Sequence, residues 1–262
     1  LVNRGRAVDG QLRYLELADD YPDSPYAPVA LYEASINAAN LLAETDMEGF
    51  RLDDSEPMQL LIRLTDQYGA NRELLFYARL KQGDIARDVG QFGIARGIYE
   101  NLIHNFPDHP ERYLPEMARA DAILAQAGND PDQMSDAVSA YERLVDRPNV
   151  PTDLRVEAGY KWGFSLERSG SATGAEETYF LVVTRFLHDA DRPGDLGTTG
   201  RYWMARTLLA LGQLYEDRGA LREARTIYRQ ILDYRLPGAS LASGNLERLD
   251  NARTPATAYV EP

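Results

Sequence analysis

Hydrophobic residues in this chain recur every three or four positions, and polar residues fill the positions between them. Leu208, Leu211 and Tyr215 show this spacing, which returns apolar side chains to one face of an α-helix. Clusters of Pro and Gly interrupt the pattern, and long alternating runs of β-branched residues are missing. The pattern therefore predicts an all-α chain of about twelve helices. The expected helices lie near residues 5–20, 26–43, 56–68, 71–89, 91–105, 111–127, 133–146, 151–169, 172–187, 200–217, 221–234 and 240–251.

One signature recurs four times. A small residue is followed after four positions by tyrosine and after seven positions by an aliphatic residue. Glycine stands twelve and five positions before the small residue in three of the four copies. The four sets are Ala95, Tyr99 and Leu102; Ala137, Tyr141 and Leu144; Ala175, Tyr179 and Val182; and Ala224, Tyr228 and Ile231. The glycines are Gly83 and Gly90, Gly163 and Gly170, and Gly212 and Gly219, whereas the second copy carries Ala125 and Asp132.

Self-similarity at this period indicates stacked helix pairs, because one pair cannot bury its apolar face alone and needs neighbours on both sides. A small residue where two helices cross lets their backbones approach closely. Glycine at the turn supplies a positive φ without a steric penalty. We therefore expect a solenoid whose task is to hold another molecule rather than to transform it.

The signature resembles the tetratricopeptide repeat, most clearly in the last copy from Leu208 to Pro237. The resemblance implies a right-handed superhelical solenoid of antiparallel helix pairs, forming a single array over residues 1–250 with a polar tail at 251–262. It implies clear repeats at 75–108, 111–148, 151–187 and 200–237, and degenerate repeats over 1–70. Tyr14, Leu17 and Pro22 fit the end of a repeat whose first helix lies before residue 1. An unrelated helical bundle is the alternative.

In this family, the first helix of each pair lines a concave groove. The residues that the resemblance places there are Tyr77, Asp84, Arg119, Gln126, Glu157, Tyr160, Phe164, Arg206 and Gln213. Tyr160 and Phe164 are four residues apart on one helix face and could receive an apolar side chain. Arg119 and Arg206 could engage carboxylates. The alternative is that Phe164 packs in the core and the arginines form surface ion pairs of small energetic value.

Composition narrows the range of partners. The net charge of −13 disfavours nucleic acid and anionic lipid surfaces. Cysteine is absent, so no disulfide or thiol nucleophile is available. No run of apolar residues is long enough to predict a membrane span. Because the sequence starts at Leu1, we expect a processed or excised segment.

No chemical motif favours a catalytic or metal-binding role, and we expect no cofactor. His104, His109 and His188 are expected to be exposed or capping residues. The acidic run 189–195 resembles a calcium loop, but Pro193 stands at the fifth ligand position and Gly200 where the bidentate Glu belongs. The Lys and Asn residues with which related modules clamp chaperone C-termini are also missing from the groove positions.

These observations predict a non-catalytic module that binds a protein or peptide partner in its groove. A finer resemblance concerns the junctions at 21–27 and 106–110, which are similar to those of bacterial envelope tetratricopeptide proteins, namely the barrel-assembly lipoprotein and the Tol and division coordinator. It implies a periplasmic or cell-envelope location, with the cytoplasm as the alternative. Two other functions remain open, a structural spacer within a larger protein and a helical accessory domain of a cell-wall-active enzyme.

Overall fold

The computed structural model describes residues 2–42, 51–128, 130–188 and 196–251. These residues form twelve α-helices and contain no β-strand, which confirms the all-α prediction. Their contacts divide the chain into two compact units, Leu1–Gln126 and Ala127–Pro262. The expectation of a single continuous array through residue 250 stays a prediction, as do the handedness of the superhelix and the polar tail, of which 252–262 lie outside the described residues.

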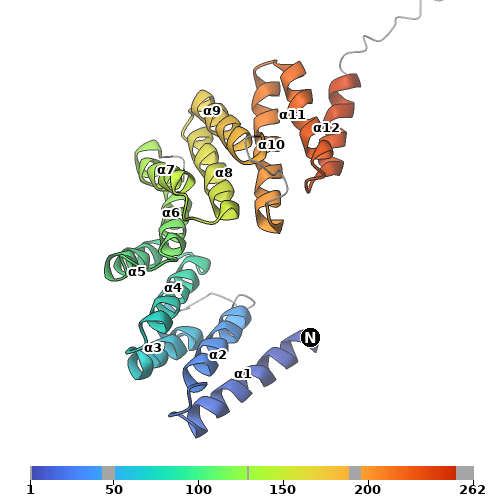
Figure 1. Cartoon of the computed structure of the whole chain (residues 1–262). Coiled ribbons are helices and arrows are strands. Elements are labelled where there is room, and N and C mark those ends of the chain that lie inside the picture. The colour runs from blue at the N-terminus through green and yellow to red at the C-terminus, as the bar shows by residue number, and fades with distance from the viewer. Residues whose placement is uncertain (1, 43–50, 129, 189–195, 252–262) are drawn as a thin grey trace, which may run out of the picture. The chain divides into compact units, whose positions relative to one another are not determined.

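Unit 1 covers the N-terminal helices, in which α1 packs along α2 (Figure 1). Its elements are α1 (Val2–Asp20), α2 (Ala27–Leu42), a 3₁₀ turn (Leu52–Asp54), α3 (Glu56–Tyr68), α4 (Arg72–Asp88), α5 (Phe92–Asn105) and α6 (Tyr113–Ala127).

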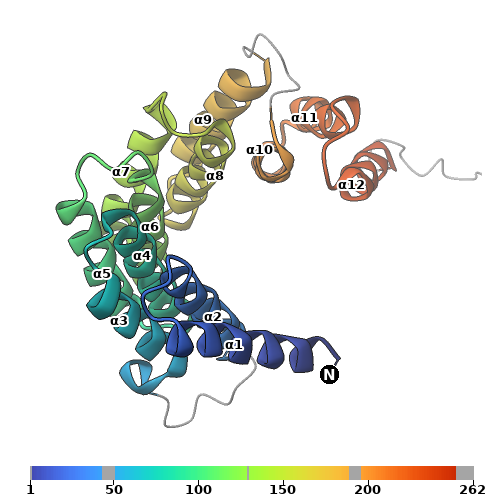
Figure 2. The ribbon, with the colours of Figure 1, turned by 60° about the horizontal axis from the view of Figure 1, so that its bottom comes forward.

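Unit 2 continues the same helix-turn-helix pattern, and α11 lies between α10 and α12 (Figures 1 and 2). Its elements are α7 (Pro131–Asp146), α8 (Thr152–Arg168), α9 (Ala172–Val183), a π-helical turn (Thr184–His188), α10 (Thr198–Asp217), α11 (Leu221–Asp233) and α12 (Ala239–Asn251). The predicted helix at 133–146 begins at Pro131 instead, because the Asp130 side chain accepts the backbone N–H groups of Asp132 and Gln133.

The turn glycines take the conformation that the sequence predicts. Gly90, Gly170 and Gly219 have φ of 77°, 86° and 80°. Each closes the first helix with the same bonds, for example Gly90 N–H to Arg87 O at 2.9 Å and Gln91 N–H to Ala86 O at 2.8 Å. The second copy has Asp132 at this position, and there Gly128 supplies the positive φ, at 58°.

The other glycine of each pair lies where the two helices cross. A Cβ atom added to Gly83, Gly163 or Gly212 would lie 2.3–2.4 Å from the Cε1 atom of a tyrosine on the following helix. These tyrosines are Tyr99, Tyr179 and Tyr228, and each is 0% exposed. The ring therefore occupies the space that a side chain on the first helix would need, which explains why glycine and tyrosine recur together.

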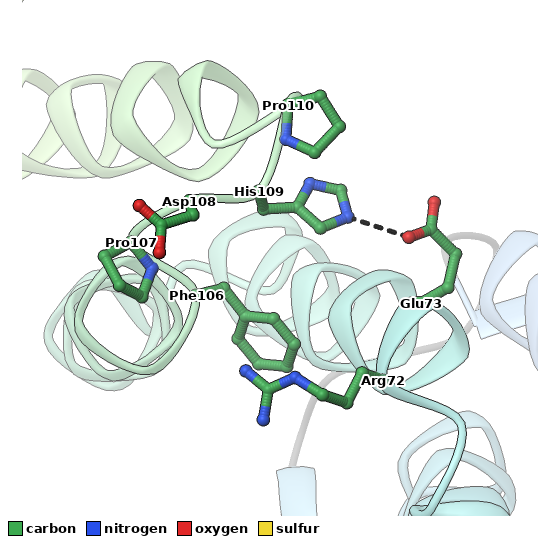
Figure 3. Close-up of a pocket in the computed structure, with 7 residues that line it drawn as sticks. All are labelled: Arg72, Glu73, Phe106, Pro107, Asp108, His109 and Pro110. Atoms are coloured by element: carbon green, nitrogen blue, oxygen red, sulfur yellow. Dashed lines mark hydrogen bonds and ion pairs between the residues drawn. The ribbon is translucent and has the colours of Figure 1, made fainter.

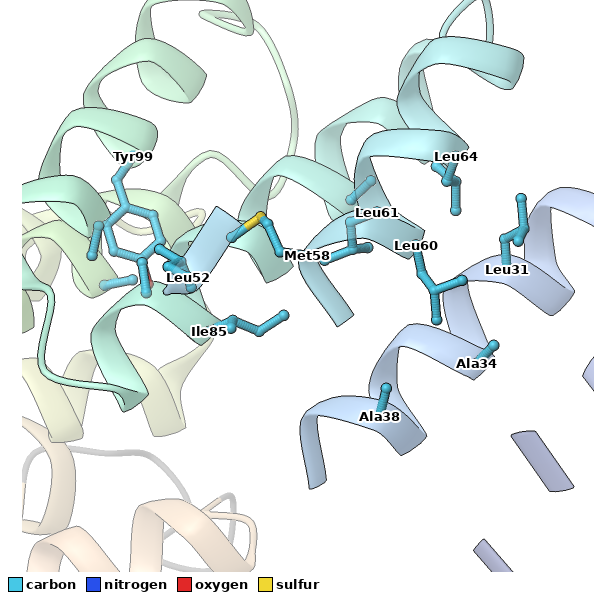
Figure 4. Packing of buried hydrophobic residues seen from close by; sticks show 14 of the residues in the cluster. Leu31, Ala34, Ala38, Leu52, Met58, Leu60, Leu61, Leu64, Ile85 and Tyr99 are labelled. Carbon is cyan, nitrogen blue, oxygen red and sulfur yellow. The ribbon is translucent and has the colours of Figure 1, made fainter. Parts of the chain in front are cut away.

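The core of unit 1 runs through its helices as a continuous apolar layer. Figure 4 shows Leu31 of α2, Leu61 and Leu64 of α3 and Tyr99 of α5 within this cluster. Leu31, Leu61 and Leu64 are each 0% exposed. Burial of a leucine side chain contributes about 1.5–3 kcal/mol, so helix stacking supplies most of the stability of the unit.

The last helix of unit 2 is held by a buried arginine. The Arg225 side chain on α11 is 9% exposed, and its Nε donates to Asp250 Oδ1 at 3.0 Å. Its guanidinium also donates to the backbone carbonyl of Leu249. These bonds satisfy the buried charge and fix the C-terminal end of α12 against α11.

Candidate functional site

Five residues of unit 2 form an aromatic–arginine cluster on the neighbouring helices α8 and α10. Tyr160 and Phe164 come from α8, and Tyr202, Trp203 and Arg206 come from α10. Each helix presents its pair at a spacing of four residues, Tyr160 with Phe164 and Tyr202 with Arg206, which lie one turn apart on one face. The α8–α10 contact brings the two sets together.

The rings of the cluster form a connected surface. The Tyr160 and Phe164 rings are 6.1 Å apart at an interplanar angle of 12°, so the predicted aromatic pair exists. Trp203 lies 5.2 Å from Tyr160 and 5.1 Å from Tyr202, the latter edge to face. Tyr160 is 8% exposed and Phe164 is partly buried, whereas Tyr202 is 46% exposed. Tyr160 therefore supports the surface, and Tyr202 is the ring most available to a ligand.

The guanidinium of Arg206 is held against these rings. Its Cζ lies 4.8 Å from the Tyr160 ring centroid and 5.4 Å from that of Trp203. It donates to Tyr160 Oη at 2.9 Å and to Tyr202 Oη at 3.2 Å. No carboxylate among the described residues lies within 4.0 Å of it. Arg206 is thus an exposed, positioned cation whose hydrogen-bond partners in the chain are neutral.

The remaining predicted groove residues of unit 2 are engaged within their own helices. Glu157 Oε1 forms an ion pair with Lys161 Nζ at 2.7 Å. Gln213 Nε2 donates to Asp217 Oδ1 at 2.8 Å. These contacts leave Tyr160, Phe164 and Arg206 as the predicted residues that the structure brings together.

The predicted groove residues of unit 1 do not form such a cluster. Tyr77 Oη donates to Glu111 Oε2 at 2.6 Å, and this hydrogen bond raises the pKa of Tyr77. Asp84 accepts the Tyr99 hydroxyl at 2.8 Å, and burial raises its pKa. Arg119 pairs with Glu100 at 2.9 Å, and Gln126 is exposed. Arg119 therefore matches the surface-pair alternative. Whether these residues line a groove stays a prediction.

The sequence reasoning missed Tyr202 and Trp203. The sequence spacing could have indicated Tyr202, because it precedes Arg206 by one helical turn and the two residues share a helix face. Family positions alone did not include them. The contact between Arg206 and Tyr160, which are 46 residues apart, follows only from the packing of α8 against α10.

A cavity lies at the junction between α5 and α6, beside the start of α4 (Figure 3). It has a volume of about 320 Å³ and is lined by Arg72, Glu73, Phe106, Pro107, Asp108, His109 and Pro110. The Arg72 guanidinium lies 4.6 Å above the Phe106 ring and donates to the Asn105 carbonyl at 3.0 Å. The Arg72 cation therefore faces an aromatic ring and a backbone oxygen. Both contacts join α4 to the end of α5, so this part of the cavity wall has a structural role.

His109 caps the turn as expected, but its side chain is only 7% exposed, which the sequence did not predict. Its ring stacks on Phe76 at 3.6 Å and 10°. Nδ1 accepts the Glu111 N–H at 3.1 Å, so the Nε2 that faces Glu73 at 3.2 Å carries the proton.

We expect His109→Ala to lower the free energy of unfolding of unit 1 by about 1 kcal/mol, because it removes the ring stack and the cap. Urea unfolding followed by circular dichroism measures this loss. The control is His104→Ala, an exposed position, which should change stability by less than about 0.5 kcal/mol. Equal effects of the two substitutions would contradict a structural role for His109.

Among the described residues, no group of three or more His, Asp or Glu side chains is arranged to hold a metal ion. The acidic run 189–195 lies outside the described residues. A search of the described helices finds none with the length and apolar character of a membrane span.

No protein-family model matches the chain, and no curated protein matches it. Among solved structures, it is similar to the nearly identical TPR-like repeats of a Podosopora anserina protein described as a kinesin light chain. The identity is 14% and the TM-score 0.47, over 76% of this chain and 94% of that chain. A variant of the same protein gives the same identity and TM-score, over 76% and 93% of the two chains.

Proposed function

We propose that this chain is a non-catalytic protein-interaction module of the tetratricopeptide type, and that unit 2 binds its partner on the aromatic–arginine cluster. Two observations support the repeat assignment. The signature recurs four times in the sequence, and three copies share the same glycine–tyrosine crossing in space. Such helix pairs arrive preformed, so a peptide or partner helix carries most of the entropic cost of binding.

The single observation that carries the binding proposal is the set of groups around the Arg206 guanidinium. Its guanidinium is fixed by two tyrosine hydroxyls and three rings, and its charge has no carboxylate partner among the residues described. Guanidinium has about five N–H donors, so several remain for a ligand. A carboxylate is the group that best matches this charge and geometry.

The exposed rings of the cluster indicate which side chain should lie next to the carboxylate in the ligand. Tyr202 is 46% exposed, and Trp203 and Phe164 are each partly exposed beside it. An aliphatic or aromatic side chain adjacent to the ligand carboxylate would cover these faces and exclude water from the ion pair. The proposed ligand is therefore a peptide or helix with Asp, Glu or a C-terminal carboxylate next to an apolar residue.

A peptide selection tests the proposal. Phage-displayed random peptides selected on the folded chain should be enriched in an acidic residue next to an apolar one. Fluorescence anisotropy should then show that Arg206→Gln weakens binding of the selected peptide by about tenfold or more. The matched control is Arg229→Gln, an exposed arginine of α11 in the same unit. Selected peptides without acids, or equal losses in both variants, would contradict the proposal.

The cell-envelope setting is part of this proposal. Its support is the resemblance of the junctions at 21–27 and 106–110 to those of bacterial envelope repeat proteins. The absence of cysteine is compatible with an oxidising compartment. Fractionation of source cells that express the tagged full-length protein should place it with periplasmic or envelope markers, and recovery with cytosolic markers would contradict the setting.

A further inference from the structure

Two arginines of unit 2 lie against the same aromatic ring. The Cζ atom of Arg155, near the start of α8, is 4.9 Å from the ring centroid of Phe186, and the Cζ atom of Arg185 is 5.6 Å from it. Phe186 and Arg185 belong to the π-helical turn that follows α9, and Phe186 is 5% exposed. The two guanidinium groups are therefore neighbours in space, although they come from different helical segments.

The chain holds each guanidinium at one nitrogen. Arg155 Nε donates to the carbonyl of Val145, which is one of the last carbonyls of α7, at 2.8 Å. Arg185 Nη1 donates to Asp146 Oδ1 at 2.6 Å. Within the part of the chain that the structure describes, neither guanidinium forms another hydrogen bond or ion pair. A guanidinium has about five N–H donors, so each of the two keeps several for a ligand.

The charges around Phe186 are not balanced. Two guanidinium groups lie beside one carboxylate, that of Asp146, whose side chain is 66% exposed. Burial lowers the pKa of Arg155, and the nearby charge of Arg185 lowers it further, by more than Asp146 raises it. The two cations therefore repel each other at close range, and an anion bound between them would relieve this repulsion.

From this geometry we propose that Arg155 and Arg185 form a binding site for a phosphate group with several free oxygens, either inorganic phosphate or a phosphate monoester such as phosphoserine in a partner protein. Guanidinium groups bind phosphate in a bidentate manner. The free N–H donors of two arginines match the oxygens of one phosphate better than the two oxygens of one carboxylate. Both arginines are partly exposed, Arg185 at 37% of its side chain, so a ligand reaches them from solvent.

Titration calorimetry with inorganic phosphate tests this site in the intact chain. We expect saturable binding at millimolar phosphate, and Arg185→Gln should weaken it by about tenfold or more. The matched control is Arg222→Gln, at an exposed arginine of α11, which should leave the affinity unchanged. Asp146→Asn should strengthen binding several-fold, because it removes the carboxylate that competes with phosphate for Arg185. A purely structural role of the two arginines does not predict this gain.

A short phosphoserine peptide separates the two sources of the phosphate. Binding of Gly-Gly-phosphoserine-Gly-Gly, weakened by Arg185→Gln and absent for the serine form, would support a phosphorylated partner, and binding of inorganic phosphate alone would support the free ion. No saturable binding of either probe, equally tight binding of acetate, or unchanged binding by Arg185→Gln would overturn the inference. Circular dichroism checks that Arg185→Gln is folded, and if it is not, Asp146→Asn carries the test. The peptide selection for Arg206 concerns a different arginine, so the two proposals fail separately.

Discussion

We expect Gly83→Ala to lower the free energy of unfolding of unit 1 by about 2–3 kcal/mol. This sign is opposite to the usual one, because alanine stabilises a helix interior by roughly 0.5–1 kcal/mol relative to glycine. The added Cβ would lie 2.4 Å from Cε1 of Tyr99 and 2.9 Å from its Cδ1 and Cζ. The ring cannot step aside, because it is 0% exposed and its hydroxyl is bound to Asp84. The methyl group must therefore push α4 and α5 apart.

Gly97→Ala is the matched control, since Gly97 lies on the same helix as Tyr99 and no heavy atom lies within 4 Å of its would-be Cβ. We expect this change to stabilise the unit by roughly 0.5–1 kcal/mol. Adding Tyr99→Leu to Gly83→Ala should cost less than the two single changes together, because the smaller side chain makes room. Urea unfolding measures the change in the free energy of unfolding. Faster hydrogen exchange in α4 and α5 would show that the destabilisation lies at their crossing. A neutral Gly83→Ala would refute the crossing account.

The same contacts explain how much of the fold was predictable from sequence. The small residue, the tyrosine and the turn glycine act within one helix pair, so their offsets along the chain are fixed by helix geometry. The helices and the turns at Gly90, Gly170 and Gly219 followed from that local pattern. The early start of α7 did not follow from the repeat pattern, because it depends on the Asp130 side chain, which accepts the N–H groups of Asp132 and Gln133.

The candidate site was less predictable, because it depends on contacts between helix pairs. Tyr160 and Phe164 could be paired from their spacing, but the position of Arg206 over Tyr160 depends on how α8 packs against α10. Position in the repeat also could not show which arginine is already paired. Arg119 has Glu100 as a partner, whereas Arg206 has only tyrosine hydroxyls.

The second large effect on stability is expected when the carboxylate of Glu216 in unit 2 is replaced. The Glu216 side chain on α10 is 8% exposed and accepts two hydrogen bonds from Arg248 of α12, at 2.6 and 2.7 Å. It also accepts the Tyr228 hydroxyl of α11 at 2.7 Å. One carboxylate thus joins three helices. We expect Glu216→Gln to lower the free energy of unfolding of unit 2 by about 2 kcal/mol at neutral pH, a value kept moderate because Arg248 is 55% exposed.

The pH dependence of this loss identifies its cause. The hydrogen bonds from Arg248 lower the pKa of Glu216 below its usual 4.5, assisted by Tyr228 and opposed by burial. A folded-state pKa below the unfolded one means that the stabilisation is complete above the unfolded pKa and is lost as the pH falls through the folded pKa.

The difference in free energy of unfolding between wild type and Glu216→Gln should therefore be constant from about pH 7 to pH 5.5 and shrink below about pH 4.5. Urea unfolding across this range measures it, with Glu247→Gln, an exposed neighbour of Arg248, as the control. A difference that stays constant down to about pH 3 would show that shape, rather than the charge of Glu216, joins the three helices.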